Sequence, residues 1–220
     1  MCPNGNAERT RKIILDAAIK IVSQHGLDEL TAGRLIQQAR VSKGGLYHHF
    51  RTMTEVESEV LILLSENIRI KLSAYPKPES MSEFMDVVEQ ELFECFVTES
   101  DEAKALFSFI SSAAHNREVQ VILRQLMDTI NLQRLQQLQA VSAGVHFAQL
   151  QNTVQIISTV QTGLMTRFFI AEDLTSLKNY WRGCRGMLEN LLGISAEAPL
   201  PEQSVEPQVN VMPMASTNLN

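Results

Sequence analysis

The sequence predicts an all-α protein, and three observations support this prediction. No run of residues alternates between apolar and polar side chains as a half-buried strand requires. From Arg11 to about Gly193, apolar residues instead recur at spacings of three and four, which is typical of amphipathic helices. The segments between these periodic stretches are short, so a helical bundle is expected.

Three short helices are predicted at the start of the chain. The first ends at Gly26, which readily takes the left-handed conformation at a helix end. Thr31 and Ser42 are suitable N-caps for the second and third helices. The residues that these helices turn inward are Ile14, Ala17, Ala18, Ile21, Val22, Leu35, Ile36, Ala39, Leu46 and Phe50, and Val41 is the apolar residue of the turn. The short connection between the second and third helices has the length of a helix-turn-helix.

The outward face of the third helix suits a DNA backbone. A lysine supplies charge, a tyrosine and a histidine supply donors, and two glycines let the helix start approach a phosphate closely. Each glycine weakens a helix by roughly 1 kcal/mol relative to alanine, a cost that a purely structural helix seldom carries. The predicted recognition surface is Ser42, Lys43, Gly44, Gly45, Tyr47 and His48, with Thr31, Arg40 and Arg51 as backbone contacts. The alternative is a three-helix cap with no nucleic-acid partner.

The N-terminal quarter of the chain resembles the DNA-binding domain of TetR-family transcriptional regulators. The residues that carry the resemblance are Arg11, Ile14, Leu15, Ala17, Ala18, Gly26, Thr31, Ala39, Val41, Ser42, Gly44, Leu46, Tyr47 and Phe50. Ile36, Arg40 and Met53 depart from the family pattern, standing in place of an alanine, a glycine and a phosphate-binding lysine. The resemblance implies a helical body that binds a small molecule and forms a dimer.

The charge distribution agrees with a DNA-binding head on an acidic body. The whole chain has a formal net charge of −6. Residues 1–56 contain eight basic and five acidic side chains, a net charge of +3, so the remaining residues carry −9. Such an asymmetry favours a basic reading head, while the acidic body limits non-specific attraction to DNA.

The rest of the chain is expected to form a helical bundle. The periodicity predicts helices over about 54–74, 82–98, 102–114, 118–141, 148–170 and 174–192. The 220 residues are enough for two cores. We therefore expect a helix-turn-helix domain over residues 1–53, a ligand-binding and dimerisation domain over 54–194, and a proline-rich, disordered tail over 195–220.

A small-molecule pocket is predicted on the first helices of this body. Phenylalanine and methionine line one face of 82–98 and of 102–114, which favours an apolar or aromatic effector. The predicted ligand-binding residues are Glu89, Phe93, Phe96 and Phe107, with Glu89 positioned to hold a cationic group. In the alternative interpretation the aromatic stripe is plain core, and Glu89 extends to water.

A homodimer is predicted on the last two helices, because each has more apolar surface than one bundle position would bury. The predicted interface residues are Phe147, Val154, Ile157, Leu164, Phe168, Trp181, Cys184, Leu188 and Leu191. Residues 135–166 contain no charged side chain, which is typical of an interface, and their many glutamines argue against a membrane span. In the alternative, both stripes close the core of a single chain.

Other classes of protein find little support. The three cysteines are far apart, the histidines are isolated or adjacent, and no catalytic motif is present, so no disulfide, metal, cofactor or enzymatic activity is expected. The N-terminus lacks a signal peptide, which predicts a cytoplasmic protein. The resemblance favours a repressor that a small molecule releases from palindromic operator DNA. The alternatives are a helical protein–protein interaction module and a DNA-binding activator that senses no ligand.

Overall fold

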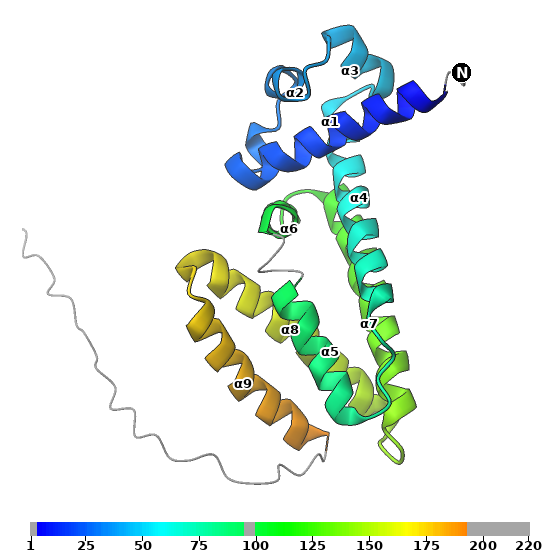
Figure 1. The fold of residues 1–220 in the computed structure, drawn as a ribbon, viewed down its shortest axis with the longest axis vertical. Helices are drawn as coiled ribbons and strands as arrows, with labels where there is room; N and C mark the ends of the chain where they lie inside the picture. The colour runs from blue at the N-terminus through cyan, green and yellow to red at the C-terminus, as the bar shows by residue number, and fades with distance from the viewer. Residues whose placement is uncertain (1–3, 95–99, 193–220) are drawn as a thin grey trace, which may run out of the picture.

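The computed structural model describes residues 4–94 and 100–192, which form helices and no strands (Figure 1). The elements are α1 (Asn4–His25), the 3-10 helix η1 (Leu27–Glu29), α2 (Ala32–Ala39), α3 (Lys43–His49), α4 (Met53–Ala74), α5 (Met81–Phe93), α6 (Ser100–Ser112), α7 (Arg117–Val141), α8 (Phe147–Ala171) and α9 (Leu174–Leu191). The all-α prediction is confirmed. The end of the predicted helix over 82–98 and the tail beyond 192 lie outside the described residues.

The predicted caps define the ends of the first helices. The Thr31 hydroxyl accepts a hydrogen bond from the backbone N–H of Arg34 at the start of α2. The Ser42 hydroxyl accepts one from Gly45 at 3.0 Å, which fixes the start of α3. Gly26 follows α1 with φ 87°, the left-handed conformation expected there.

Helices α1, α2 and α3 form a head at one end of the molecule (Figure 1). Helix α4 leaves the head and runs beside α7, and α6 packs against α1. Helices α5, α8 and α9 form the half of the body that is distant from the head (Figure 1). The helices α4, α6 and α7 therefore connect the head to the rest of the body.

Two hydrophobic cores divide the molecule. The first combines buried residues of α1, α2, α3 and α4 with others from α6 and α7. The second combines α5, the end of α7, α8 and α9. The first core crosses residue 53, so the head is not packed independently of the body. The division at residue 53 stays a prediction.

The predicted dimer stripe is wrong for five of its nine residues. Val154, Ile157, Leu164, Trp181 and Leu188 are buried within a single chain, in the second core. The physical reason is that α8 packs against α7 and α9, and these helices together with α5 enclose the stripe in the second core. Of the other predicted interface residues, Phe168 and Cys184 are half-buried, whereas Phe147 and Leu191 are each 51% exposed. None of the described helices combines the length and the apolar character that a membrane crossing needs.

Candidate DNA interface and ligand cavity

The predicted recognition surface lies on one exposed face of α3. Leu46 and Phe50 anchor the helix in the first core, with almost no exposed surface. Lys43, Gly44 and His48 are exposed, and Tyr47 is 41% exposed. The side chains that sequence reasoning assigned to DNA therefore remain available to a partner.

The cations of the head fall into two groups. Arg11 pairs with Glu59 at 2.6 Å and Arg34 pairs with Glu29 at 3.1 Å. By contrast, Arg40, Lys43 and Arg51 are exposed and form no ion pair with any residue that the structure describes. These three are the cations that were predicted to contact DNA; the Glu55 carboxylate accepts the backbone N–H of Arg51 at 2.6 Å but forms no ion pair with its guanidinium.

Arg40 adopts a conformation that few non-glycine residues accept. It follows α2 with φ 54° and ψ 41°, and its backbone N–H donates to the carbonyl of Ile36. This left-handed conformation costs an L-residue roughly 1–2 kcal/mol, which explains why the family pattern has glycine here. The arginine side chain is held at the turn of the helix-turn-helix in spite of that cost.

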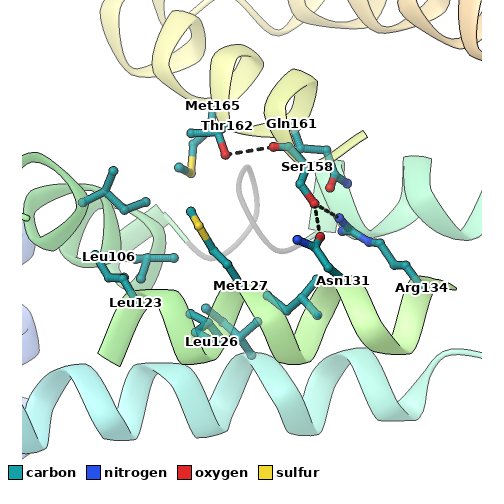
Figure 2. Close-up of a pocket in the computed structure, with 13 residues that line it drawn as sticks. Leu106, Leu123, Leu126, Met127, Asn131, Arg134, Ser158, Gln161, Thr162 and Met165 are labelled. Carbon is teal, nitrogen blue, oxygen red and sulfur yellow. Dashed lines mark hydrogen bonds between the residues drawn. The ribbon is translucent and has the colours of Figure 1, made fainter. Parts of the chain in front are cut away.

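A cavity of about 90 Å³ lies between α4, α6, α7 and α8 (Figure 2). Most of its wall is apolar, and Leu106, Leu123 and Leu126 belong to the first core as well. A second cavity of about 40 Å³ adjoins it, because both are lined by Ile68, Leu106, Ile130 and Arg134. The cavity thus contacts the residues that pack the head against the body.

The opposite end of the cavity is polar. Arg134, 6% exposed, forms an ion pair with Glu91, 3% exposed, and their closest N–O distance is 2.6 Å. The other terminal nitrogen of Arg134 donates to the Ser158 hydroxyl at 3.2 Å, and Ser158 donates to the side-chain oxygen of Asn131. Figure 2 shows Asn131 and Arg134 on α7 and Ser158 on α8 at this end of the cavity. The amide of Gln161 donates to the backbone carbonyl of Val88 and ties α8 to α5.

Three of the predicted ligand-binding residues, Glu89, Phe93 and Phe107, do not line this cavity. Glu89 and Asp86 pair with Arg185 of α9, at 2.9 and 2.7 Å. Glu89 therefore links α5 to α9, and it shares the single positive charge of Arg185 with Asp86 and Glu189. Phe93 packs against the second core, and the Phe107 ring contacts Phe169 with centroids 5.4 Å apart. Phe96 lies outside the described residues.

Sequence reasoning missed the Glu91–Arg134 pair, although a signal was present. Glu91 stands seven residues after Phe84 on the apolar stripe of α5, and Arg134 follows Ile130 by four residues on that of α7. A carboxylate and a guanidinium on apolar stripes of two helices must pair if the stripes meet, since an unpaired buried charge is costly.

Besides the buried stripe, α8 and α9 carry exposed apolar side chains. Met187 is 63% exposed, Tyr180 is 43% exposed and Ile156 is 41% exposed. A Cβ atom built at Gly163 or Gly183 would meet nothing within 4 Å in the single chain. The two glycines leave room for a helix of a second subunit, and the Arg167 guanidinium stacks on the Tyr180 ring at 4.7 Å from its centroid.

No group of three or more His, Cys, Asp or Glu side chains that could hold a metal ion occurs among residues 4–94 and 100–192.

The head has the helix order of a helix-turn-helix domain, and comparison with known proteins shows which family this region matches. Residues 14–60 match the model of bacterial regulatory proteins of the tetR family. The helix-turn-helix region of the chain, about a fifth of its length, is therefore similar to this family. A family of regulatory proteins agrees with the expectation that the chain is not an enzyme.

Two relatives match about a quarter of the chain each. The HTH-type transcriptional regulator AcrR of Shigella flexneri is 36% identical over 62 residues, 28% of this chain and 29% of that protein. The regulator SrpR of Pseudomonas putida is 36% identical over 55 residues, 25% of this chain and 26% of that protein. The match therefore spans less than a third of the length of either relative.

Solved structures extend the similarity of fold to the body. A TetR transcription regulator from Haloarcula marismortui has a TM-score of 0.69 at 15% identity, covering 84% of this chain and 97% of that one. GusR of Salmonella enterica has a TM-score of 0.67 at 17% identity, covering 84% and 96%. The multidrug binding protein EbrR, solved with ethidium, has a TM-score of 0.65 at 16% identity, covering 83% and 98%.

Proposed function

We propose that this protein is a DNA-binding transcriptional regulator, a homodimeric repressor that leaves its operator when a small molecule occupies the body. The observation that carries the proposal is the position of the cavity. Leu106, Leu123 and Leu126 line it and also belong to the core that holds the head. A ligand that moves these side chains therefore changes the position of α3 without touching DNA.

The DNA-binding part of the proposal depends on α3 and the turn before it. The exposed Lys43 and the unpaired Arg40 and Arg51 offer three positive charges to the phosphate backbone. Gly44 is exposed at the start of α3 and adds no side-chain bulk between a phosphate and the helix N-terminus, whereas the Gly45 N–H is taken by the Ser42 hydroxyl. Base contacts would come from Tyr47 and His48, which are exposed on the same helix.

The homodimer is proposed on the outer face of α8 and α9, in place of the buried stripe. Two recognition helices about 34 Å apart read a palindrome in successive major grooves, whereas a single helix reads only a few base pairs. In a two-fold dimer, the face around Met187 and Gly183 of one chain would pack against the same face of the other chain.

Occupation of the body would act by population shift. A ligand favours the conformation in which it binds more tightly, so it weakens operator binding only if the cavity differs between the two states. EbrR, with the same fold, was solved with ethidium and with imidazole, which is a precedent for small molecules in such a body.

A direct test uses the DNA upstream of the gene that encodes the protein. We expect the dimer to shift a duplex from that region at nanomolar concentration and an effector to reverse the shift. If none of the compounds that stabilise the protein changes its affinity for DNA, the protein is instead the DNA-binding activator that senses no ligand. Absence of salt-dependent binding to any duplex would favour the protein–protein interaction module.

A further inference from the structure

We propose that the cavity between α7 and α8 selects a compact apolar molecule with a hydrogen-bond-accepting oxygen at one end, a carboxylate or a carbonyl, and excludes cations. This inference rests on the proposed sensing function, because it specifies the ligand class of the same cavity. It is carried by the identity of the polar groups at one end and by the charge of the wall.

The charge of the wall excludes cations. Among the described residues that line the cavity, Arg134 is the one ionised side chain, and no carboxylate is among them. Glu91, which neutralises Arg134, lines the adjacent smaller cavity instead. A cationic group in the larger cavity would therefore lie on the guanidinium side of the Glu91–Arg134 pair, with no carboxylate in the wall to accept its hydrogen bonds.

The polar groups that face the cavity have donors to spare. Two nitrogens of Arg134 donate to one carboxylate oxygen of Glu91, at 3.2 and 2.6 Å, and a third donates to Ser158. A guanidinium has five N–H groups, so two of them remain. The Asn131 oxygen accepts from Ser158, while its amide nitrogen donates to no group in the described part of the chain. Asn131, Ser158 and Arg134 lie next to one another at the polar end (Figure 2), where an oxygen of the ligand would accept from the Asn131 amide or from Arg134.

The rest of the cavity determines the size and polarity of the molecule. Leu123 and Met165 form part of an apolar wall, and the volume of about 90 Å³ is below the roughly 300 Å³ of a typical drug site. Met127 lines the cavity and is 42% exposed, so the cavity reaches solvent beside a flexible side chain. A single ring with one planar head group matches these dimensions.

Three isosteric probes separate the possibilities: benzoate, benzamide and benzamidine. They share one ring and a planar head, but the head is respectively an anionic acceptor, a neutral acceptor and a cationic donor. We expect benzoate and benzamide to raise the melting temperature of the full-length dimer. Benzoate should bind at least tenfold more tightly than benzamidine by calorimetric titration, because a charge-assisted hydrogen bond is gained in one case and lost in the other.

The variant Asn131→Asp tests the site without breaking the buried ion pair. Its carboxylate still accepts from Ser158 but replaces the free amide donor with a negative charge. We expect benzoate affinity to fall at least tenfold and the preference over benzamidine to disappear. Gln125→Glu adds the same charge at an exposed position of α7 and should leave benzoate affinity within about twofold.

The possible outcomes distinguish the ligand class from the proposed function. The inference is overturned if benzamidine binds as tightly as benzoate, if none of the three probes binds, or if Asn131→Asp leaves benzoate affinity unchanged. If the probes bind in the expected order but do not release operator DNA, the ligand class stands and the sensing function fails. If a cationic compound releases the operator, the function stands and the ligand class fails.

Discussion

Replacement of Arg40 by asparagine separates the two roles of this position, in backbone conformation and in charge. The residue has φ 54° and is exposed, with no ion-pair partner in the described residues. Asparagine is among the non-glycine residues that best tolerate the left-handed region. Arg40→Asn should therefore leave the free energy of unfolding unchanged or raise it by up to about 1 kcal/mol.

The expected loss of DNA affinity follows from counterion release. Each phosphate that a side chain neutralises contributes about 0.9 to the slope of log K against log salt, or a factor of about 8 at 0.1 M salt. A dimer presents Arg40 twice. Arg40→Asn should therefore weaken operator binding about 60-fold at 0.1 M salt and reduce the slope by about 1.8.

Fluorescence anisotropy with a labelled operator between about 50 and 300 mM salt measures both quantities, and thermal unfolding measures stability. Arg40→Lys keeps the charge and should bind almost as the parent does. Arg124→Gln removes the same charge from the exposed side of α7 and should change neither slope nor affinity appreciably. A parental slope for Arg40→Asn, or equal effects of Arg40→Asn and Arg124→Gln, would refute the assigned contact.

Three further predictions concern α3, the dimer and the head–body junction. Gly44→Ala should stabilise α3 by about 0.5–1 kcal/mol and still weaken operator binding, whereas Gly45→Ala should gain less stability, since its Cβ would lie 3.2 Å from the capping Ser42 oxygen. Met187→Glu should give a folded monomer with weak operator binding, measured by sedimentation and anisotropy. Burial, and then the negative charges of Glu118 and Asp28, raises the pKa of Glu57 above its ordinary 4.5. Glu57→Gln should therefore increase the free energy of unfolding at pH 7 by less than about 1 kcal/mol, measured by thermal unfolding.

The sign of the Glu57 effect follows from proton linkage. A carboxyl with a raised pKa disfavours the folded state where it is ionised, and this cost disappears as the pH falls through the folded pKa toward 4.5. The stability advantage of Glu57→Gln should therefore vanish in acid; a constant advantage down to pH 4 would contradict this prediction.

For the dimer prediction, Val121→Glu on α7 is the matched control. A Met187→Glu protein that remains dimeric would rule out the proposed face.

Local signals explain why the helix ends could be predicted from the sequence. Ser42 and Thr31 accept hydrogen bonds from the third backbone N–H beyond them, and this interaction depends on neighbours in the sequence alone. The end of α1 at Gly26 was predictable for the same reason, because the left-handed conformation there is one that glycine itself favours. The predicted core of the head was correct because its apolar residues leave a single inward face on each helix.

The site in the body could not be predicted in the same way, because periodicity does not identify the partner of a stripe. Glu89 and Glu91 lie two residues apart, and the choice between them depends on whether α7 or α9 packs on that side of α5. For α8, Ile157 and Ile156 are neighbours on different apolar faces, one buried in the chain and the other exposed. Only the packing of whole helices determines which face remains for a second subunit.

The small cavity limits how strongly a ligand could regulate DNA binding. Filling about 90 Å³ of apolar space that is lost in the other state is worth about 2 kcal/mol at roughly 24 cal/mol per Å³. One site would thus change operator affinity about 30-fold, and two sites in a dimer would change it about a thousandfold. Because a nearly complete switch needs about 5.5 kcal/mol, cavity filling alone falls short by about 1 kcal/mol. A hydrogen bond to Asn131 or Arg134 that forms in one state alone would supply that difference, so the polar end of the cavity determines which molecules switch the protein as well as which bind.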